Sequence, residues 1–260
     1  MIQVGIYGAR GRMGEELCQA VLSCPEVELS FLYEREGHGE LGRMFHSLNL
    51  DSRLDALLEK SDVIIDFTTP LATMALLKAN KNYKKPLVIG TTGLDSSQQK
   101  EVGQAALDYP VVFSPNYSIG VNVLLEVLAQ AGKTLSKTQD YDLEIVERHH
   151  RYKKDSPSGT ALKLAEVAAT ASGRDLGKDA VYGREGILNE RQIDEIGIFA
   201  VRAGDIIGEH TVIFSTLGET IEFSHKAHSR QTFAKGAVAA AKWLSARTHG
   251  LFTMKEVLGL

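Results

Sequence analysis

The sequence predicts a two-domain α/β protein, in which a doubly wound parallel sheet is followed by a smaller α+β domain with a mixed sheet. Three observations predict this. Five continuous apolar runs of strand length alternate with helical stretches between residues 2 and 114, as in a parallel sheet buried on both faces. A long amphipathic helix pattern begins after Pro115. Three strand-like segments then follow residue 196 without helices between them, which indicates a mixed or antiparallel sheet.

The elements are read in chain order from these patterns. The first domain is expected to contain strands over 2–7, 27–33, 63–68, 86–90 and 110–114, with helices near 12–23, 53–60, 71–80 and 95–107. The second is expected to contain a helix over 120–135, strands over 140–147, 196–204, 210–218 and 220–227, and a closing helix over 232–246. The predicted bounds are therefore 1–118 and 119–228, with the segment from about 229 to 260 packing back on the first domain. We expect ligands in a cleft between the domains.

The composition excludes several classes of protein. Lys and Arg total 29 against 33 Asp and Glu, so neither a nucleic-acid coat nor a polybasic membrane tether is indicated. The two cysteines cannot form a disulfide framework and have no metal-ligand spacing, so no metal is expected. The start MIQVGIYGARG lacks the features of a signal peptide, and no apolar run is long enough to span a membrane. These features predict a cytoplasmic globular protein.

The first strand leads directly into the turn GARGRMG and then into a helix. Glycines at Gly8, Gly11 and Gly14 allow a tight turn and a close approach to a pyrophosphate, which the helix N-terminus attracts. Glu34 ends the second strand twenty residues after Gly14 and can accept hydrogen bonds from the adenosine ribose. The adjacent Arg35 can pair with a 2′-phosphate. This register predicts a Rossmann-type site for NADH or NADPH; the alternative is a solvated charged loop.

Two further loops follow strand ends, where open α/β sheets bind their ligands. They are GTTG (90–93) and SPNYS (114–118), both small and polar. Such loops suit the nicotinamide and its ribose. Ordinary strand-to-helix turns with helix caps explain them equally well.

The run RHHRYKK (148–154) is an unusual concentration of cations and imidazoles, and it precedes the turn SPSGT. Ser158 or Thr160 is a plausible N-cap for the helix that follows. A helix N-terminus faced by Lys and His is an anion site, which suits one or two carboxylates. The alternatives are a solvated basic loop or a nucleic-acid contact, but only Tyr152 could stack on a base.

His149 and Lys153 share a face whether this run is extended or helical, whereas His150 faces elsewhere. The neighbouring cations disfavour an imidazolium, so a protonated histidine here is a stronger acid than usual. A bound dianion would partly offset this effect. The pattern therefore predicts a general acid in an anion-binding pocket.

Several motifs together resemble the dihydrodipicolinate reductase family, from Val4 to about Leu244. They are GxxGRMG, DFTTP, GTTG, SPNYSIGVNV, ERHHRYKKDSPSGTA, VRAGDIIGEHTV and FSHKAHSRQTFAKGAV. The resemblance implies that NADH or NADPH delivers a hydride to C4 of a dihydropyridine dicarboxylate. Protonation then gives tetrahydrodipicolinate, in the diaminopimelate route to lysine. It also implies a homotetramer built through the sheet of the second domain.

The same resemblance implies roles for individual residues. His149 matches the proton donor and acceptor, and Lys153 a proton-donating or electrostatic group. The positions that match the substrate carboxylate site are His150, Ser158, Gly159 and Thr160. Those that match cofactor contacts are Gly8, Ala9, Arg10, Gly11, Arg12, Met13, Glu34, Arg35, Gly90, Thr91, Thr92, Ser114, Pro115, Asn116 and Tyr117.

Some positions depart from the family pattern or stay open. Arg10 stands where a third glycine is common, which leaves the NADH or NADPH preference open, and Ser156 replaces the usual alanine. Arg202 and His210 could bind carboxylates or support the sheet. Asp66, at the end of a buried strand, is expected to order the following loop. The alternative functions are a non-catalytic NAD(P) sensor and a related small dehydrogenase, for instance one acting on aspartate.

Overall fold

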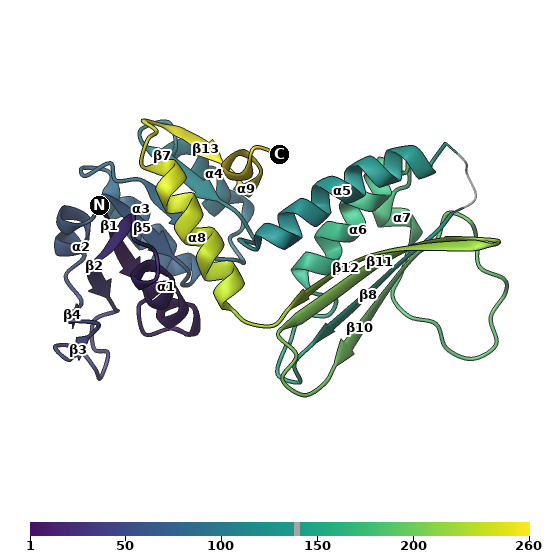
Figure 1. Ribbon diagram of the computed structural model, residues 1–260, viewed down its shortest axis with the longest axis horizontal. Coiled ribbons are helices and arrows are strands. Elements are labelled where there is room, and N and C mark those ends of the chain that lie inside the picture. The colour runs from purple at the N-terminus through teal and green to yellow at the C-terminus, as the bar shows by residue number, and fades with distance from the viewer. Residues whose placement is uncertain (138–140) are drawn as a thin grey trace. The chain divides into compact units, whose positions relative to one another are not determined.

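The computed structural model describes residues 1–137 and 141–260, and this part of the chain forms two compact units (Figure 1). Unit 1 comprises residues 1–119 and 230–260, and unit 2 comprises residues 120–229. Each boundary falls one residue after the one read from the sequence. The chain therefore leaves unit 1, completes unit 2, and returns to unit 1 for its last helices.

Unit 1 is built on a parallel sheet. Its strand order is β13-β7-β6-β5-β1-β2-β4-β3, and among these described strands only the pair β3–β4 is antiparallel. The strands are β1 (Ile2–Tyr7), β2 (Val27–Tyr33), β3 (Met44–Phe45), β4 (Leu48–Asp51), β5 (Val63–Asp66), β6 (Leu87–Ile89), β7 (Pro110–Phe113) and β13 (Gly250–Phe252). The helices are α1 (Arg12–Leu22), α2 (Leu54–Lys60), α3 (Pro70–Asn80), α4 (Ser96–Ala105), α8 (Gln231–Leu244) and α9 (Met254–Leu258).

Helices cover both faces of this sheet because its strands are apolar on both sides. On one face Val4 and Ile6 of β1 pack with α1, α8 and α9. On the other face Tyr7 and Ile64 pack with α2, α3 and α4. The continuous apolar runs that predicted strands buried on both faces are thus explained, and the doubly wound parallel sheet is confirmed.

The order of the strands places the loops that matter at one edge of unit 1. β1 pairs with β2 on one side and with β5 on the other, so the chain reverses its winding direction at β1. The carboxyl ends of parallel strands lie at the same edge, and open α/β sheets bind ligands there. The turn 8–14 and the loops after β2, β5, β6 and β7 all start at that edge.

Unit 2 is a mixed five-stranded sheet in the order β12-β11-β8-β10-β9, covered by helices on one face (Figure 1). Its strands are β8 (Asp142–His149), β9 (Ala180–Val181), β10 (Ile196–Arg202), β11 (Gly208–Thr216) and β12 (Glu219–Ala227). Its helices are α5 (Ile119–Leu135), α6 (Gly159–Ala171) and α7 (Leu176–Asp179). The core between sheet and helices includes Leu128, Ile145, Leu164 and Phe214.

The main difference from the predicted elements concerns β8. The predicted strand 140–147 begins at Asp140, which lies outside the described residues, and the observed strand continues to His149. It continues through Glu147 and Arg148 because these residues pair with β10 on one side and with β11 on the other. The short elements β3, β4, α7, β9, β13 and α9 were not predicted, since their runs are too brief to show a period. No helix in the described part of the chain is long and apolar enough to cross a bilayer.

Candidate active site

The glycine turn after β1 is shaped by close backbone contacts. Gly8 has a φ of +83°, and a Cβ on Gly14 would lie 2.2 Å from the carbonyl oxygen of Gly8. The N–H groups of Gly8 and Ala9 both donate to the carbonyl of Tyr33, at 3.0 and 2.9 Å. Gly11 stands at the N-cap of α1, so no side chain covers the start of that helix. This cradle fits a pyrophosphate bound by backbone N–H groups.

Glu34 lies beside the turn, at the end of β2. Its Oε2 accepts a hydrogen bond from the backbone N–H of Arg10 at 3.3 Å, and its Oε1 accepts one from the N–H of Arg35 at 3.1 Å. The Arg35 side chain is exposed, as are most of the residues that follow it. The structure therefore brings the turn and the acidic residue together.

The loops after β5 and β6 are joined through Asp66, which is fully buried. Its carboxylate accepts hydrogen bonds from the hydroxyls of Thr68 at 2.5 Å, Thr73 at 2.6 Å and Thr91 at 3.2 Å. Burial raises the pKa of Asp66, and the three threonine hydroxyls oppose that rise. The Thr91 hydroxyl also accepts from the N–H of Thr68 at 2.9 Å, so it is committed to the protein, whereas Thr92 is exposed.

Two residues of the loop after β7 turn inward. The Tyr117 side chain is 1% exposed, and its hydroxyl lies 3.0 Å from the carbonyl oxygens of Ile89 and Val112. The Ser114 hydroxyl donates to the carbonyl of Asn116 at 3.0 Å. These side chains fix the shape of the loop, and any ligand here would meet mainly backbone and the remaining polar groups.

In unit 2 the alternation of β8 separates the residues of the cationic run. Leu143, Ile145, Glu147 and His149 face the helices, whereas Arg148 lies on the opposite face. Arg148 pairs there with Glu209, its cross-strand neighbour on β11, at 3.1 Å. Of these two consecutive residues, only His149 therefore points into the interior of unit 2.

Glu147 is the centre of the buried polar cluster. Its side chain is fully buried and accepts two hydrogen bonds from the Arg202 guanidinium, at 2.7 and 2.8 Å. It also accepts from the Ser158 backbone N–H at 3.1 Å and bonds His149 Nδ1 at 2.5 Å. Burial would raise the pKa of Glu147, but the bonds from Arg202 and His149 outweigh it and hold this pKa below its usual value.

These bonds determine how His149 is protonated. An ionised carboxylate can only accept, so Nδ1 of His149 carries a proton and donates it to Glu147. Burial lowers the pKa of His149; Glu147 opposes this, while Lys153 and Arg202 add to it. The neutral ring therefore has its lone pair on Nε2. A Cβ on Gly208 would lie only 3.0 Å from that atom, so glycine leaves the nitrogen accessible.

The remaining residues of the run lie around the end of β8. Lys153 Nζ is 3.0 Å from the Asp155 carboxylate, and its side chain is partly buried. His150 Nδ1 is buried and has no hydrogen-bond partner within the described residues. Arg151 and Tyr152 are exposed. Lys153 is among the charges that lower the pKa of His149, so the two residues lie within electrostatic reach of each other. That they share a face stays a prediction.

Ser158 and His210 hold the start of α6. Ser158 is the N-cap: its hydroxyl accepts from the N–H of Ala161 at 3.1 Å and lies 3.1 Å from His210 Nε2. His210 is buried, and this burial lowers its pKa to about 3. His210 therefore stays neutral near pH 7 and supports the helix start. The predicted substrate residue Gly159, by contrast, is exposed as the first residue of α6.

Sequence reasoning missed Glu147. The signal was present, because in DLEIVERH the acidic residue falls on the apolar side of the alternation, in register with Leu143 and Ile145. A charge on the buried face of a strand requires a buried partner. That partner, Arg202, is 55 residues away on β10, so only the sheet register reveals the pair.

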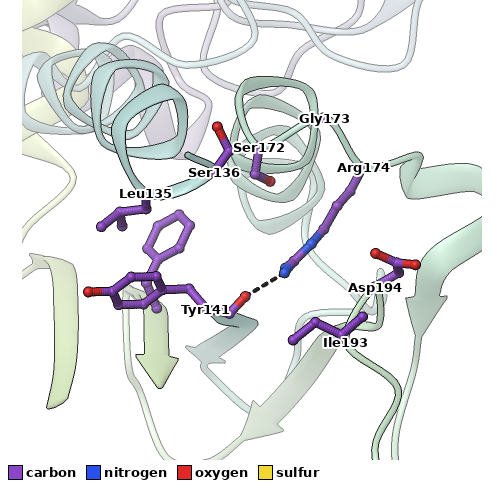
Figure 2. Close-up of a pocket in the computed structure, with 9 residues that line it drawn as sticks. Leu135, Ser136, Tyr141, Ser172, Gly173, Arg174, Ile193 and Asp194 are labelled. Carbon is purple, nitrogen blue, oxygen red and sulfur yellow. Dashed lines mark hydrogen bonds between the residues drawn. The ribbon is translucent and has the colours of Figure 1, made fainter. Parts of the chain in front are cut away.

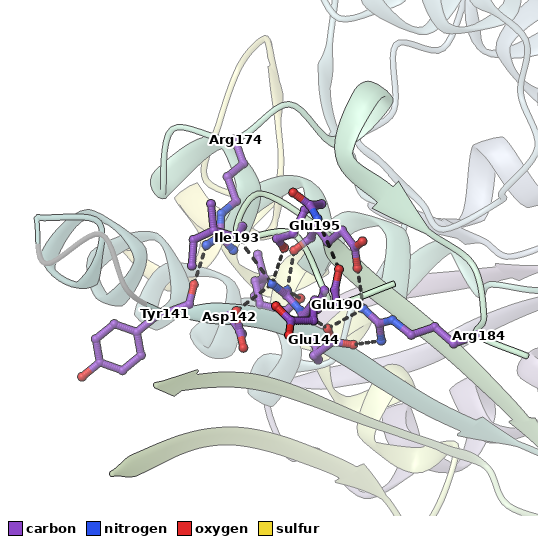
Figure 3. A network of polar contacts seen from close by, with 11 residues as sticks. Tyr141, Asp142, Glu144, Arg174, Arg184, Glu190, Ile193 and Glu195 are labelled. Atoms are coloured by element: carbon purple, nitrogen blue, oxygen red, sulfur yellow. Dashed lines mark hydrogen bonds and ion pairs between the residues drawn. The ribbon is translucent and has the colours of Figure 1, made fainter. Parts of the chain in front are cut away.

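Two other features of unit 2 lie away from these residues. A cavity of about 300 Å³ beside the end of α6 is lined by Arg174, Ser172, Tyr141 and Asp194, among others (Figure 2). The segment before β10 is held on β8 by ion pairs of Arg184 and Arg191 with Glu144 (Figure 3). Among the described residues no group of His, Cys, Asp or Glu converges as a metal site would require.

Comparison with known proteins identifies the family. The fold and the turn are those of a nicotinamide-dependent oxidoreductase with a second, sheet-based unit. A family model described as dihydrodipicolinate reductase, N-terminus, matches residues 2–117, and the corresponding C-terminus model matches 120–258. The chain belongs to the dihydrodipicolinate reductase family.

Individual relatives agree. The chain is 50% identical to 4-hydroxy-tetrahydrodipicolinate reductase of Hahella chejuensis (strain KCTC 2396), over 100% of both chains. It is 46% identical to the protein of the same name from Laribacter hongkongensis (strain HLHK9), over 100% of this chain and 98% of that one. The dipicolinate-bound dihydrodipicolinate reductase of Paenisporosarcina sp. TG-14 shares 26% identity, with a TM-score of 0.76 and 98% of each chain covered.

The chain is thus an oxidoreductase of the lysine pathway that reduces dihydrodipicolinate with NADH or NADPH. The family and activity implied by the sequence motifs are confirmed.

Proposed function

We propose that unit 1 binds the dinucleotide and that unit 2 binds the dicarboxylate substrate and supplies the proton for this reduction. The observation that carries the proposal is the buried group of Glu147, His149 and Arg202 beside the N-terminus of α6. It pairs an imidazole of controlled tautomer with a nearby cation, Lys153, and with a helix start that attracts anions.

In unit 1 the residues present fit a dinucleotide. The N–H groups of the first turn of α1 would hold the pyrophosphate, because Gly8, Gly11 and Gly14 carry no side chain that would block its approach to the backbone. Glu34 would accept from the adenosine ribose, and the loops 90–92 and 114–117 would receive the nicotinamide end. When bound, NADH or NADPH supplies the hydride.

In unit 2 the substrate carboxylates would be held by cations and backbone donors. Lys153 supplies charge, and the first N–H groups of α6 at Gly159 and Thr160 supply directed donors. The buried Nδ1 of His150, which lacks a partner among the described residues, would gain one from a carboxylate if it carries the proton. The dipicolinate-bound relative is a protein whose ligand is a pyridine dicarboxylate of this kind.

His149 is proposed to transfer the proton. After hydride arrives at C4 of the ring, the electron pair it displaces needs a proton, and Nε2 of a protonated His149 can donate it. Glu147 keeps the ring oriented through Nδ1, so the donating nitrogen always faces the same way. The lowered pKa of His149 makes its imidazolium a stronger acid, and the charge of a bound dianion restores its proton occupancy.

We further propose that the chain assembles as a homotetramer through the sheet of unit 2 and acts in the cytoplasm. The support for assembly is the sheet face opposite α5 and α6, where Val146, Ile213 and Val201 are partly or largely exposed. Light scattering coupled to size-exclusion chromatography should give four times the 28.4 kDa chain mass. A monomer at micromolar concentration would contradict this assembly.

The test of the function is the loss of NADH or NADPH absorbance when the protein meets freshly generated dihydrodipicolinate. The wild type should turn over, and Lys153→Ala should lose about 100-fold or more in rate while still binding cofactor. Lys154→Ala, which removes the neighbouring exposed lysine, is the matched control and should keep its rate. Cofactor binding without turnover in any of the three would favour a sensor; turnover of L-aspartate instead would favour the related dehydrogenase.

A further inference from the structure

The side chain of Arg10, in the glycine turn, is held by the loop that follows β2. Its Nε donates to Glu40 Oε2 at 2.8 Å, and its Nη1 donates to Glu15 Oε2 at 2.7 Å. The guanidinium carbon also lies 4.1 Å from the centre of the Phe45 ring. The Arg10 guanidinium is therefore already bound by two carboxylates and packed on an aromatic ring.

Further contacts hold the two carboxylates in place. The hydrogen bond from Arg10 holds the pKa of Glu40 below its usual value, and Arg43 adds a weaker attraction at 3.7 Å. His46 Nε2 lies 3.2 Å from the second oxygen of Glu15. The Arg10 side chain is only 24% exposed, so the pairing is partly shielded from solvent.

Arg10 lies beside the residue that is proposed to bind the adenosine ribose. The backbone N–H of Arg10 bonds Glu34, the acidic residue that ends β2 and, under the proposed function, accepts from that ribose. A 2′-hydroxyl can donate to Glu34. A 2′-phosphate needs a free cation instead, and it would meet the charges of Glu34, Glu15 and Glu40.

We propose that Glu40, assisted by Glu15, withholds Arg10 from a 2′-phosphate and thereby makes this chain prefer NADH to NADPH. The inference rests on the proposed dinucleotide site and assigns the specificity to a residue outside the glycine turn. Arg35 remains as an exposed cation that permits NADPH to bind. NADPH should therefore bind more weakly than NADH without being excluded.

The test is a double-mutant cycle read by binding alone. Dissociation constants for NADH and NADPH are measured by the fluorescence of the reduced nicotinamide, on wild type, Glu40→Gln, Arg10→Gln and the double variant. Glu40→Gln should lower the NADPH Kd by roughly threefold to tenfold and leave the NADH Kd within about twofold, because one charge-assisted hydrogen bond becomes available. Arg10→Gln alone should change the NADPH Kd little, and the double variant should lose the gain.

Controls separate this effect from net charge and from folding. Glu101→Gln removes one exposed carboxylate on α4 and should leave both Kd values unchanged. Glu15→Gln should shift the ratio in the same direction as Glu40→Gln, and thermal denaturation checks that each variant is folded. A wild type that binds NADPH as tightly as NADH would overturn the proposal, as would a gain that persists without Arg10. If the wild type binds neither cofactor, the proposed dinucleotide site itself is wrong.

Discussion

The glycine turn of unit 1 and the Glu147 cluster of unit 2 differ in the groups that form them, which are backbone groups in the turn and side chains in the cluster. The turn is backbone: Gly8 and Gly14 permit close approaches that any side chain would prevent. The cluster is side chain: Glu147 and His149 of β8 and Arg202 of β10 bond one another, and His210 of β11 is joined to them through Ser158. The first arrangement can only bind, whereas the second can also hold and release a proton.

The two regions should therefore respond differently to substitution. A turn built from closely packed backbone is sensitive to added volume, so one extra methyl group should distort it. A buried ionic cluster loses stability when one partner is removed, because another charge is then left buried without compensation.

Glu147→Gln should break the cluster while keeping its shape. Arg202 would then face a neutral amide, and the free energy of unfolding should fall by about 3 kcal/mol. The variant should also lose about 10- to 100-fold in kcat, because the tautomer of His149 is no longer fixed. Urea denaturation and steady-state kinetics measure the two effects.

A pH profile separates positioning from stability in this variant. Glu147 raises the pKa of His149, so its loss should move the limb of kcat/KM that reports protonated His149 to lower pH. Glu147→Asp, which restores a carboxylate, should recover part of the rate and part of the shift. An unchanged profile in Glu147→Gln would show that Glu147 only stabilises the fold.

Gly14→Ala should damage unit 1 by crowding. The new methyl group would meet the Gly8 carbonyl oxygen and the Ala9 backbone, which cannot move without opening the turn. We expect a loss of about 1–3 kcal/mol in stability and a weaker NADH affinity. Gly103→Ala, where the methyl group would meet open space among the described atoms, should be neutral or slightly stabilising. Equal effects of the two substitutions would contradict the cradle.

His210 should make unit 2 less stable in acid. Its pKa is lowered to about 3 in the folded chain, so between that value and the unfolded value near 6.5 the unfolded chain binds more protons. The free energy of unfolding therefore falls as the pH falls through this window, by about 2 kcal/mol between pH 7.5 and 5.0. Urea denaturation at both pH values should show this loss, and His210→Asn should reduce it. An equal loss in the variant would assign the acid sensitivity to other groups.

Arg148→Gln should have the smallest effect, although it changes the same cationic run. Arg148 lies on the opposite face of β8 from His149 and pairs with the partly exposed Glu209. Removal of an exposed pair is worth under about 1 kcal/mol, and kcat should stay within about twofold of the wild type. A large loss of rate would mean that Arg148 reaches the substrate and that the strand alternation misassigns it.

The same contrast explains which parts could be read from the sequence. The turn at Gly8–Gly14 and the sheet around it depend on local patterns, so the doubly wound fold followed from them, and the turn was located by its glycine spacing together with Glu34. The cluster depends on the register between β8 and β10, which places Arg202 opposite His149. No local pattern encodes that pairing, and Arg202 and His210 therefore stayed ambiguous.

The contacts that hold the Arg10 side chain could not be predicted from the sequence, for a related reason. The sequence showed an arginine in an unusual place within the turn, but Glu40 and Phe45 lie 30 and 35 positions further along the chain. The loop between them and β2 reads as a solvated charged stretch. Its fold back onto Arg10 is a tertiary contact that only the structure reveals.

Proton transfer by His149 is tested most directly by measuring rate and NADH affinity together in His149→Asn, whose amide can still donate to Glu147. We expect a loss of about 10²- to 10⁴-fold in kcat with an NADH Kd within about twofold of the wild type. His249→Asn, an exposed histidine of unit 1, is the control and should keep both values. A His149→Asn protein that reduces the substrate at the wild-type rate would contradict the proposed proton transfer.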